Sequence, residues 1–335
     1  MKSPDWSIAF YDSRKYDEES FTEANKNFFY NIEFFDFHLN EKTASTAKGF
    51  EVVCPFVNDT LNDKVIGVLK ECGVKLIALR CAGYNNVDLK AAAKAGIKVV
   101  RVPAYSPHSV AEHGVALLMA LTRHIPQAYA RTRTGNFTLN GLTGRDLHGL
   151  TAGILGTGRI GKIMAEILSG FGMNVETYDI YPDNEWADKH GFKYVPLTQL
   201  FTDSDVLSLH CPLNDTTKHI VSEQSLQLMK HDAVIINTGR GALIDTNALV
   251  KALKKQTIGG AALDVYEEES KYFFEDWSVD IIRDDVLSRL MTFPNVIITG
   301  HQAFLTSNAL KSIAETTLSN IKAFYAGEEL ENEIK

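Results

Sequence analysis

The sequence has little cysteine and no long hydrophobic run. Four cysteines are spread along 335 residues, and none forms a Cys-x-x-Cys pair, which argues against a zinc site or a dithiol redox motif. The longest apolar stretch, Val115–Leu121, is far shorter than the roughly 20 residues that span a bilayer. The first residues contain no apolar run typical of a signal peptide. We therefore expect a cytoplasmic protein with reduced thiols, no metal site and no membrane partner.

Positively charged residues are also fewer than negatively charged ones. Lysine and arginine number 34 against 42 acidic residues, which gives a net charge of −8. This balance argues against nucleic acid or an anionic membrane as a partner. It does not exclude a small anionic substrate, since a few local cations suffice to bind one. Internal repeats and low-complexity segments are absent from the sequence. Its length is typical of a chain with two domains.

Short apolar runs alternate with helix-like stretches in two series, which predicts parallel sheets covered by helices. We place the first domain boundary near residue 103, where prolines interrupt the pattern. The candidate strands of the first series are Ile8–Tyr11, Ile32–Phe37, Val52–Phe56, Leu76–Arg80 and Val99–Val102. Those of the second series are Thr151–Leu155, Asn174–Tyr178, Val206–His210, Ala233–Asn237, Gly260–Leu263 and Val296–Thr299.

The most specific motif is a glycine-rich turn between an apolar strand and a helix-like segment. In Gly156-Thr-Gly158-Arg-Ile-Gly161, the first glycine would make the tight turn, the second would admit a pyrophosphate, and the third would allow close packing of helix and strand. Asp179 follows about 20 residues later, at the end of the next strand, where a carboxylate binds ribose hydroxyls and repels a 2′-phosphate. The motif therefore predicts NAD(H) rather than NADP(H).

Ligands of open α/β sheets bind at the carboxyl ends of strands, and an arginine, several carboxylates and a histidine follow strands of the second series. Arg240 could clamp a substrate carboxylate through two hydrogen bonds. His301 could protonate a carbonyl oxygen as hydride arrives. Glu269 would orient that histidine and favour its charged form, with Glu267 and Glu268 as alternatives. We expect structural or surface roles for the remaining histidines, among them His108, His113, His210 and His231.

At these residues the chain resembles the D-specific 2-hydroxyacid dehydrogenases, and within them the lactate subgroup, over nearly its whole length. The motifs that carry the resemblance are Arg80-Cys-Ala-Gly83-Tyr-Asn-Asn-Val-Asp88, Val102-Pro-Ala-Tyr105-Ser-Pro, Leu155-Gly-Thr-Gly-Arg-Ile-Gly161, Asn237-Thr-Gly-Arg240-Gly, Leu263-Asp-Val-Tyr-Glu-Glu-Glu269 and Gly300-His301-Gln-Ala-Phe304. The long acidic and aromatic segment from Lys271 to Leu290 also looks like that subgroup.

The resemblance implies a role for each matched residue. Arg240, Glu269 and His301 would be the catalytic arginine, the partner of the histidine and the proton donor. Backbone amides around Ala82 and Gly83 would help hold the substrate carboxylate, and Tyr105 and Phe304 would line the substrate pocket. Cofactor contacts would come, besides the three glycines, from Arg159, Ile160, Asp179, Cys211, Pro212, Thr217, Thr238, Gly239 and Asp264.

The resemblance also implies an architecture and an activity. Residues 1–103 and 300–335 would form a smaller, flavodoxin-like substrate domain, and residues 104–299 a Rossmann NAD-binding domain, both doubly wound parallel sheets. Members form homodimers or larger homo-oligomers. The implied reaction is NADH-dependent, reversible reduction of pyruvate to D-lactate. Two alternatives remain open, namely a dehydrogenase for bulkier 2-keto acids and an NAD-sensing corepressor built on the same fold.

Overall fold

The chain folds into two compact units, one of which is assembled from two separate stretches. The computed structural model describes residues 6–334. The smaller unit contains the residues up to Ser106 together with those from Leu305 onward, and the larger unit spans Pro107–Phe304. The division expected at residues 103 and 300 lies a few residues away from these boundaries. The two-sheet α/β fold class predicted from the sequence is confirmed.

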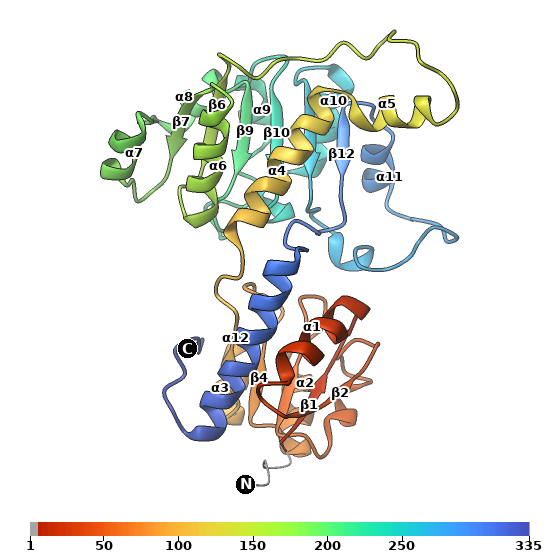
Figure 1. Cartoon of the computed structure of the whole chain (residues 1–335), viewed down its shortest axis with the longest axis vertical. Coiled ribbons are helices and arrows are strands. Elements are labelled where there is room, and N and C mark those ends of the chain that lie inside the picture. The colour runs from red at the N-terminus through yellow and green to blue at the C-terminus, as the bar shows by residue number, and fades with distance from the viewer. Residues whose placement is uncertain (1–5, 335) are drawn as a thin grey trace. The chain divides into compact units, whose positions relative to one another are not determined.

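The smaller unit is built on a five-stranded parallel sheet with the order β2-β1-β3-β4-β5, which is the flavodoxin-like arrangement. Its strands are β1 (Ser7–Phe10), β2 (Asn31–Phe34), β3 (Val52–Cys54), β4 (Leu76–Ala78) and β5 (Lys98–Val100). Its helices are α1 (Lys15–Asn25), η1 (Ala44–Ala47), α2 (Asp63–Cys72), α3 (Leu89–Ala95) and α12 (Ser307–Ala326). Helix α12 packs beside α1 although nearly 300 residues separate them (Figure 1).

The larger unit is built on a seven-stranded parallel sheet with the order β12-β11-β10-β9-β6-β7-β8, a Rossmann arrangement with one additional strand. Its strands are β6 (Thr151–Leu155), β7 (Asn174–Tyr178), β8 (Lys193–Tyr194), β9 (Val206–Leu209), β10 (Val234–Asn237), β11 (Gly260–Leu263) and β12 (Val296–Ile298). Its helices are α4 (Pro107–Thr122), α5 (Ile125–Thr132), α6 (Arg159–Gly170), α7 (Asn184–His190), α8 (Leu197–Asp203), α9 (Glu223–Leu228), η2 (Gly241–Leu243), α10 (Thr246–Lys255), η3 (Glu269–Lys271) and α11 (Asp285–Met291).

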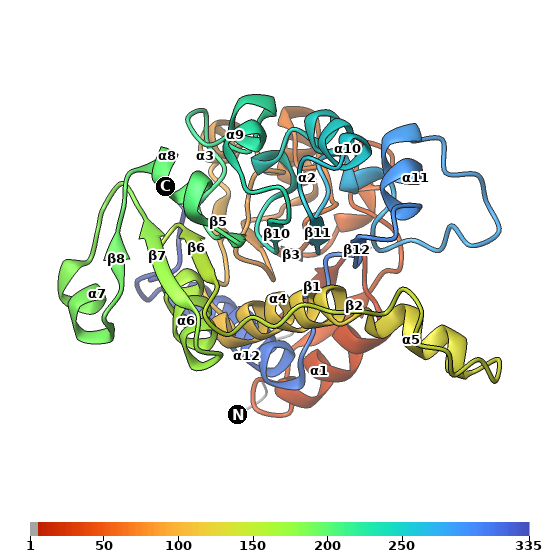
Figure 2. The same ribbon diagram turned by 90° about the horizontal axis from the view of Figure 1, so that it is seen from above.

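Two hydrophobic clusters make the core of the larger unit, one on each face of its sheet. Helices α4 and α6 cover one face, and α8, α9 and α10 cover the other (Figure 2). Strands β9, β10 and β11 consist of buried residues throughout, as expected for a parallel sheet covered on both sides. The strand expected from Ala233 begins one residue later, and the two-residue edge strand β8 was not predicted, because it has no apolar run.

Helix ends follow local chemistry that the sequence specifies. Helix α12 begins after Thr306, whose side chain accepts a hydrogen bond from the Ala309 amide, and ends at Gly327 in the left-handed conformation. These are a preferred N-cap residue and a preferred C-terminal glycine. None of the helices in residues 6–334 combines the length and apolar character needed to cross a membrane.

Candidate functional site

The glycine-rich turn has the geometry that each of its glycines predicts. Gly156 holds φ at +97°, and a Cβ there would lie 2.5 Å from the Cys211 amide nitrogen. At Gly161 a Cβ would lie 1.9 Å from the Gly156 carbonyl oxygen, so helix α6 and the turn touch through backbone. A Cβ at Gly158 would meet open space instead. The turn is therefore closed on the protein side and open where a pyrophosphate would approach.

Helix α6 begins immediately after this turn, with its N-terminus available to an anion. Gly158 is the N-cap, and no side chain of the described residues caps it. The first amides of a helix lack partners within the helix, and its dipole favours negative charge there. Arg159 and Ile160, two of the predicted cofactor residues, occupy the first turn of α6. The arrangement fits a dinucleotide phosphate.

Asp179 is held in place at the end of β7 by hydrogen bonds from the turn itself. Its Oδ2 accepts from the Thr157 amide at 2.7 Å and from Thr157 Oγ1 at 3.2 Å, and its Oδ1 accepts from the Tyr181 amide at 2.9 Å. The hydroxyl of Tyr194, on β8, bonds Thr157 Oγ1 at 2.7 Å. The acidic group that the sequence predicts for ribose recognition is thus fixed before any ligand binds.

The predicted cofactor residues after β9 and β10 lie at the carboxyl ends of those strands. Burial raises the pKa of Cys211 to about 11, so its thiol is neutral at physiological pH. Thr217 Oγ1 donates to the Pro212 carbonyl at 2.6 Å, which closes the segment into a compact turn. Thr238 is buried, and its Oγ1 has no hydrogen-bond partner among the described residues. Such an atom is costly unless a ligand or water satisfies it.

Arg240 follows β10 in the segment that leads to α10. Its Nη1 donates to the carbonyl of Gly239 at 2.8 Å, and the Asn237 side chain bonds the backbone on both sides of the turn. The Gly239 amide donates to Asn237 Oδ1 at 3.0 Å. The backbone that carries the arginine is therefore fixed, while the partly exposed guanidinium keeps further donors for an anion.

The structure brings His301 and Glu269 together, 32 residues apart in the chain. His301 Nδ1 lies 2.8 Å from Glu269 Oε1, and Glu269 Oε2 accepts from the Tyr266 amide at 2.9 Å. The exposed fractions of the His301 and Glu269 side chains are 20% and 21%. His301 holds φ at 54°, a conformation that is uncommon outside glycine and that occurs at functional sites. The ring of Phe274 lies 5.8 Å from that of His301.

Asp264 anchors the loop that carries His301. Its carboxylate is fully buried and accepts from the amides of Gln302 and Ala303 at 2.9 and 2.8 Å. Burial would raise its pKa, but hydrogen bonds from His113, Thr299 and these amides outweigh burial and lower the pKa. Contact between Asp264 and the cofactor stays a prediction.

His113, on α4, is a site residue that the sequence analysis left among the structural histidines. Its Nε2 lies 3.1 Å from Thr299 Oγ1 and 3.4 Å from Asp264 Oδ1. The histidine thus braces the carboxylate that anchors the His301 loop. No spacing rule links a helix residue to a strand end more than 180 positions later, so sequence reasoning could not find this contact.

In the smaller unit, the predicted carboxylate-binding loop follows a buried arginine. Arg80 is 1% exposed, and its Nη2 donates to the Asp12 carbonyl at 2.7 Å. Its guanidinium lies 4.3 Å from the Phe10 ring and 4.5 Å from the Phe56 ring, and its Nε is 3.5 Å from Asp17 Oδ1. Cation–π contacts and an ion pair together compensate the charge of this arginine.

The loop itself is fixed through its carbonyl groups. Arg101 Nη1 donates to the Ala82 carbonyl at 2.9 Å, and the Cys81 thiol lies 3.2 Å from the Gly83 carbonyl. Ala82 and Gly83 are partly exposed. Tyr105, also partly exposed, belongs to the smaller unit, whereas Phe304, which is 9% exposed, belongs to the larger one.

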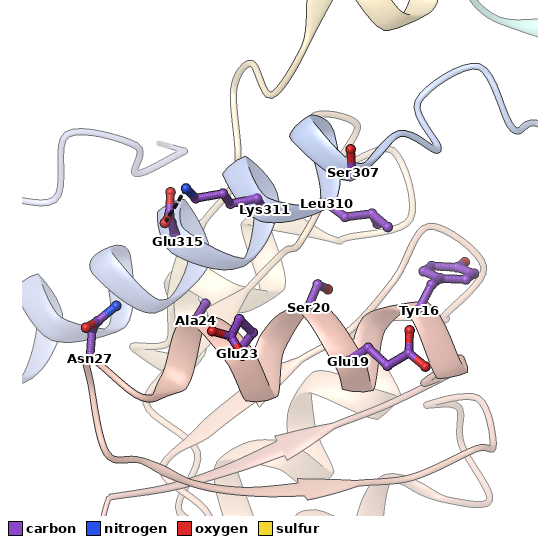
Figure 3. A pocket seen from close by; sticks show the side chains of 10 residues that line it. All are labelled: Tyr16, Glu19, Ser20, Glu23, Ala24, Asn27, Ser307, Leu310, Lys311 and Glu315. Atoms are coloured by element: carbon purple, nitrogen blue, oxygen red, sulfur yellow. Dashed lines mark ion pairs between the residues drawn. The ribbon is translucent and has the colours of Figure 1, made fainter.

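A hollow of about 510 Å³ lies elsewhere in the smaller unit, between α1 and α12 (Figure 3). None of the predicted site residues is among the described residues that line it. An ion pair between Lys311 and Glu315 of α12 lies at its rim (Figure 3). The lining residues are Tyr16, Glu19, Ser20, Glu23, Ala24, Asn27, Ser307, Leu310, Lys311 and Glu315.

The glycine turn, the fixed Asp179 and the histidine–glutamate pair lie on one Rossmann sheet, and together they define a dinucleotide-dependent dehydrogenase. Residues 115–303 match the family model described as "D-isomer specific 2-hydroxyacid dehydrogenase, NAD binding domain". The chain is 52% identical over 327 residues to a D-lactate dehydrogenase of Escherichia coli K12, covering 98% of this chain and 99% of that one.

Solved structures agree with the family match. The apo-structure of D-lactate dehydrogenase from Escherichia coli superposes with a TM-score of 0.91 at 50% identity, covering 98% of this chain and 100% of that one. A structure of the pyruvate reductase of Chlamydomonas reinhardtii superposes with a TM-score of 0.94 at 41% identity, and the match covers 99% of both chains. The protein therefore belongs to the D-isomer specific 2-hydroxyacid dehydrogenases and is an NAD-dependent enzyme.

Proposed function

We propose that the protein reduces pyruvate to D-lactate with NADH, in a reversible reaction that uses His301, Glu269 and Arg240. The observation that carries the proposal is the 2.8 Å contact between His301 Nδ1 and Glu269 Oε1, on the unit that also holds the dinucleotide turn. The names of the relatives described above support lactate and pyruvate as the substrate pair. Their level of identity supports the D-configuration, which the residues alone do not specify.

The cofactor assignment is supported by the fit of the residues to NAD(H). Gly158 leaves room for a pyrophosphate, and Asp179 presents a carboxylate to the ribose. Thr238 Oγ1, which has no hydrogen-bond partner within residues 6–334, offers a further polar contact. When bound, NADH supplies the hydride that reaches the keto carbon. The protein's own residues bind and orient the 2-keto acid and handle the proton.

His301 donates a proton from Nε2 to the carbonyl oxygen in reduction and takes it back in oxidation. Its other ring nitrogen is already bonded to Glu269, so the carboxylate fixes the ring orientation and stabilises the positive charge of the donor form. One hydride and one proton together convert the ketone to the alcohol. The histidine is left neutral and is reprotonated from solvent before the next reduction.

Arg240 binds the substrate carboxylate in this proposal, because its guanidinium can form two parallel hydrogen bonds to it. We also propose that the backbone amides of Ala82 and Gly83 help to hold a substrate carboxylate. We assign Tyr105 and Phe304 to the pocket for the methyl group of pyruvate. An extra methylene in such a pocket changes binding by only about 1–3 kcal/mol, so preference among 2-keto acids has to be measured.

We also propose that the protein is a homodimer or a larger homo-oligomer, with α5 and the following segment in the interface. None of the eight residues of α5 is buried, and it projects from the body of the larger unit in both views (Figures 1 and 2). Four large apolar side chains here are 55–79% exposed, which is typical of an interaction surface. They are Ile125, Tyr129, Phe137 and Leu139. The low cysteine content of the sequence supports the expected cytoplasmic location.

An NADH-oxidation assay over a panel of 2-keto acids, with chiral analysis of the product, tests the catalytic proposal. We expect pyruvate to give the highest kcat/KM and D-lactate as the product. Faster turnover of a branched or aromatic 2-keto acid would assign the enzyme to bulkier substrates. NADH binding without turnover of any acid in the panel would contradict the proposal and favour a sensing role. Sedimentation of the unaltered chain and of Phe137→Ser tests the oligomer.

A further inference from the structure

The three consecutive glutamates after β11 each have a different partner. Glu269 bonds His301, as described above, and Glu268 forms an exposed ion pair with Lys271 at 2.8 Å. Glu267 Oε1 lies 2.6 Å from His219 Nε2, and its Oε2 accepts from Thr246 Oγ1 at 3.2 Å. The larger unit thus contains a second histidine–glutamate pair, two residues before the first along the same loop.

This second pair joins segments that carry proposed ligand contacts. His219 ends the turn that contains Pro212 and Thr217, and its amide donates to the Ala242 carbonyl at 2.8 Å, two residues after Arg240. Glu267 lies two residues before Glu269. The pair therefore connects the cofactor turn of residues 211–219 to the arginine segment and to the glutamate loop.

The contact between the arginine segment and the glutamate loop is direct. A Cβ at Gly241 would lie 2.1 Å from the Tyr266 carbonyl carbon and 2.4 Å from the Glu267 amide nitrogen. Only glycine fits at such a backbone contact. A shift of the glutamate loop must therefore move the residue next to Arg240, and a shift of the cofactor turn is transmitted to both through His219.

Local physical chemistry favours the pair although it is partly exposed. Glu267 bonds Thr246, the first residue of α10, and a carboxylate at a helix N-terminus is stabilised by the helix dipole. Thr246 is 6% exposed, which shields this bond from water. His219 holds φ at 54°, the same value as His301. Backbone strain at a non-glycine residue persists only where surrounding contacts require it.

We propose that His219 and Glu267 are positioning residues that couple NADH binding to binding of the 2-keto acid. They act by holding the cofactor turn in a fixed position relative to Arg240 and Glu269. The inference rests on the proposed function of the same unit. It predicts that the bound cofactor raises affinity for the acid, and by thermodynamic linkage that the acid raises affinity for NADH by the same factor.

The test is an NADH fluorescence titration with and without saturating oxamate, an unreactive 2-keto acid analogue. We expect oxamate to tighten NADH binding to the unaltered protein by about tenfold, within the usual range of coupling between sites. In His219→Asn, whose amide is too short to reach Glu267, this factor should fall to near one. In His219→Gln, whose Nε2 can occupy the place of the histidine Nε2, most of the coupling should return.

Two further variants separate coupling from general loss of structure. Glu267→Asp keeps the charge but shortens the side chain, so it should lose the coupling as His219→Asn does. Glu268→Gln removes a carboxylate from the same loop without touching the pair, and it should behave as the unaltered protein. Thermal unfolding midpoints verify that each variant is folded, and the KM for pyruvate should rise in the uncoupled variants.

The outcomes distinguish this inference from the proposed function. Full coupling in His219→Asn or Glu267→Asp, in a protein that reduces pyruvate, would overturn the inference and leave the proposed function intact. Equal loss in His219→Gln and His219→Asn would also overturn it, because the hydrogen bond would not be the cause. If the unaltered protein neither binds oxamate nor reduces pyruvate, the proposed function fails and the inference fails with it.

Discussion

Replacing Glu269 by glutamine tests the proposed proton-transfer pair most directly. In the structure both carboxylate oxygens accept hydrogen bonds, one from His301 Nδ1 at 2.8 Å and one from the Tyr266 amide at 2.9 Å. A glutamine offers one acceptor oxygen and one NH₂ group. Whichever way it turns, one of the two donors faces another donor, and the negative charge beside the histidine is lost.

The size of the effect follows from these two bonds. A hydrogen bond to a charged group contributes about 1.5–3 kcal/mol, and each 1.36 kcal/mol of barrier is a factor of ten in rate. Glu269→Gln should therefore lower kcat/KM for pyruvate by about 10- to 150-fold. Both directions of the reaction use the same ring in the same orientation, so oxidation of D-lactate should fall together with reduction of pyruvate.

The assay is kcat/KM for pyruvate reduction and for D-lactate oxidation, with NADH affinity measured separately by fluorescence. Glu268→Gln is the matched control, since it removes a neighbouring carboxylate that pairs only with Lys271 in the described contacts. An unchanged kcat/KM in both directions in Glu269→Gln would refute the assignment. Parallel losses in Glu268→Gln would show that the net charge of the loop, rather than the bond to His301, sets the rate.

Three further predictions concern the cofactor, the substrate clamp and stability. Asp179→Asn keeps the shape but not the charge, so the ratio of kcat/KM for NADH over NADPH should narrow by about tenfold, or about 1.4 kcal/mol; an unchanged ratio would contradict the repulsion argument. Arg240→Lys should lose about 3 kcal/mol of transition-state stabilisation, roughly a hundredfold in kcat/KM for pyruvate, and full activity would remove the two-pronged clamp from the mechanism. Burial lowers the pKa of His210 from 6.5 to about 4, so the unfolded chain binds the extra proton first and stability is lost as pH falls from 6.5 toward 4. His210→Gln should reduce the loss of unfolding free energy between pH 7 and pH 5 by on the order of 2 kcal/mol, measured by urea unfolding.

Much of the architecture could be predicted because parallel strands buried on both faces leave a strong sequence signal. Strands β6, β7 and β11 begin and end at the predicted residues. The glycine turn could also be predicted, since the backbone contacts at Gly156 and Gly161 leave no room for a side chain. The edge strand β8 was missed because two residues carry no periodicity.

The parts of the site that escaped prediction depend on contacts between distant segments. His113 and Thr299 meet across more than 180 residues, and His219 meets Glu267 across 48. Both histidines look ordinary in the sequence, because neither has a carboxylate at a spacing that predicts contact. Among the three glutamates the sequence analysis favoured Glu269, and the structure places that carboxylate beside His301.

The two-stretch construction of the smaller unit has a consequence for the order of events during synthesis. Helix α12 contributes Ile313, Leu318 and Ile321 to the core of that unit, and these residues are made after the whole of the larger unit. On the ribosome the larger unit is complete before they emerge, whereas the β1–β5 sheet must wait with part of its apolar face uncovered. Exposed apolar surface of this kind favours aggregation and chaperone binding. The nascent chain is therefore most prone to aggregation while the β1–β5 sheet awaits α12.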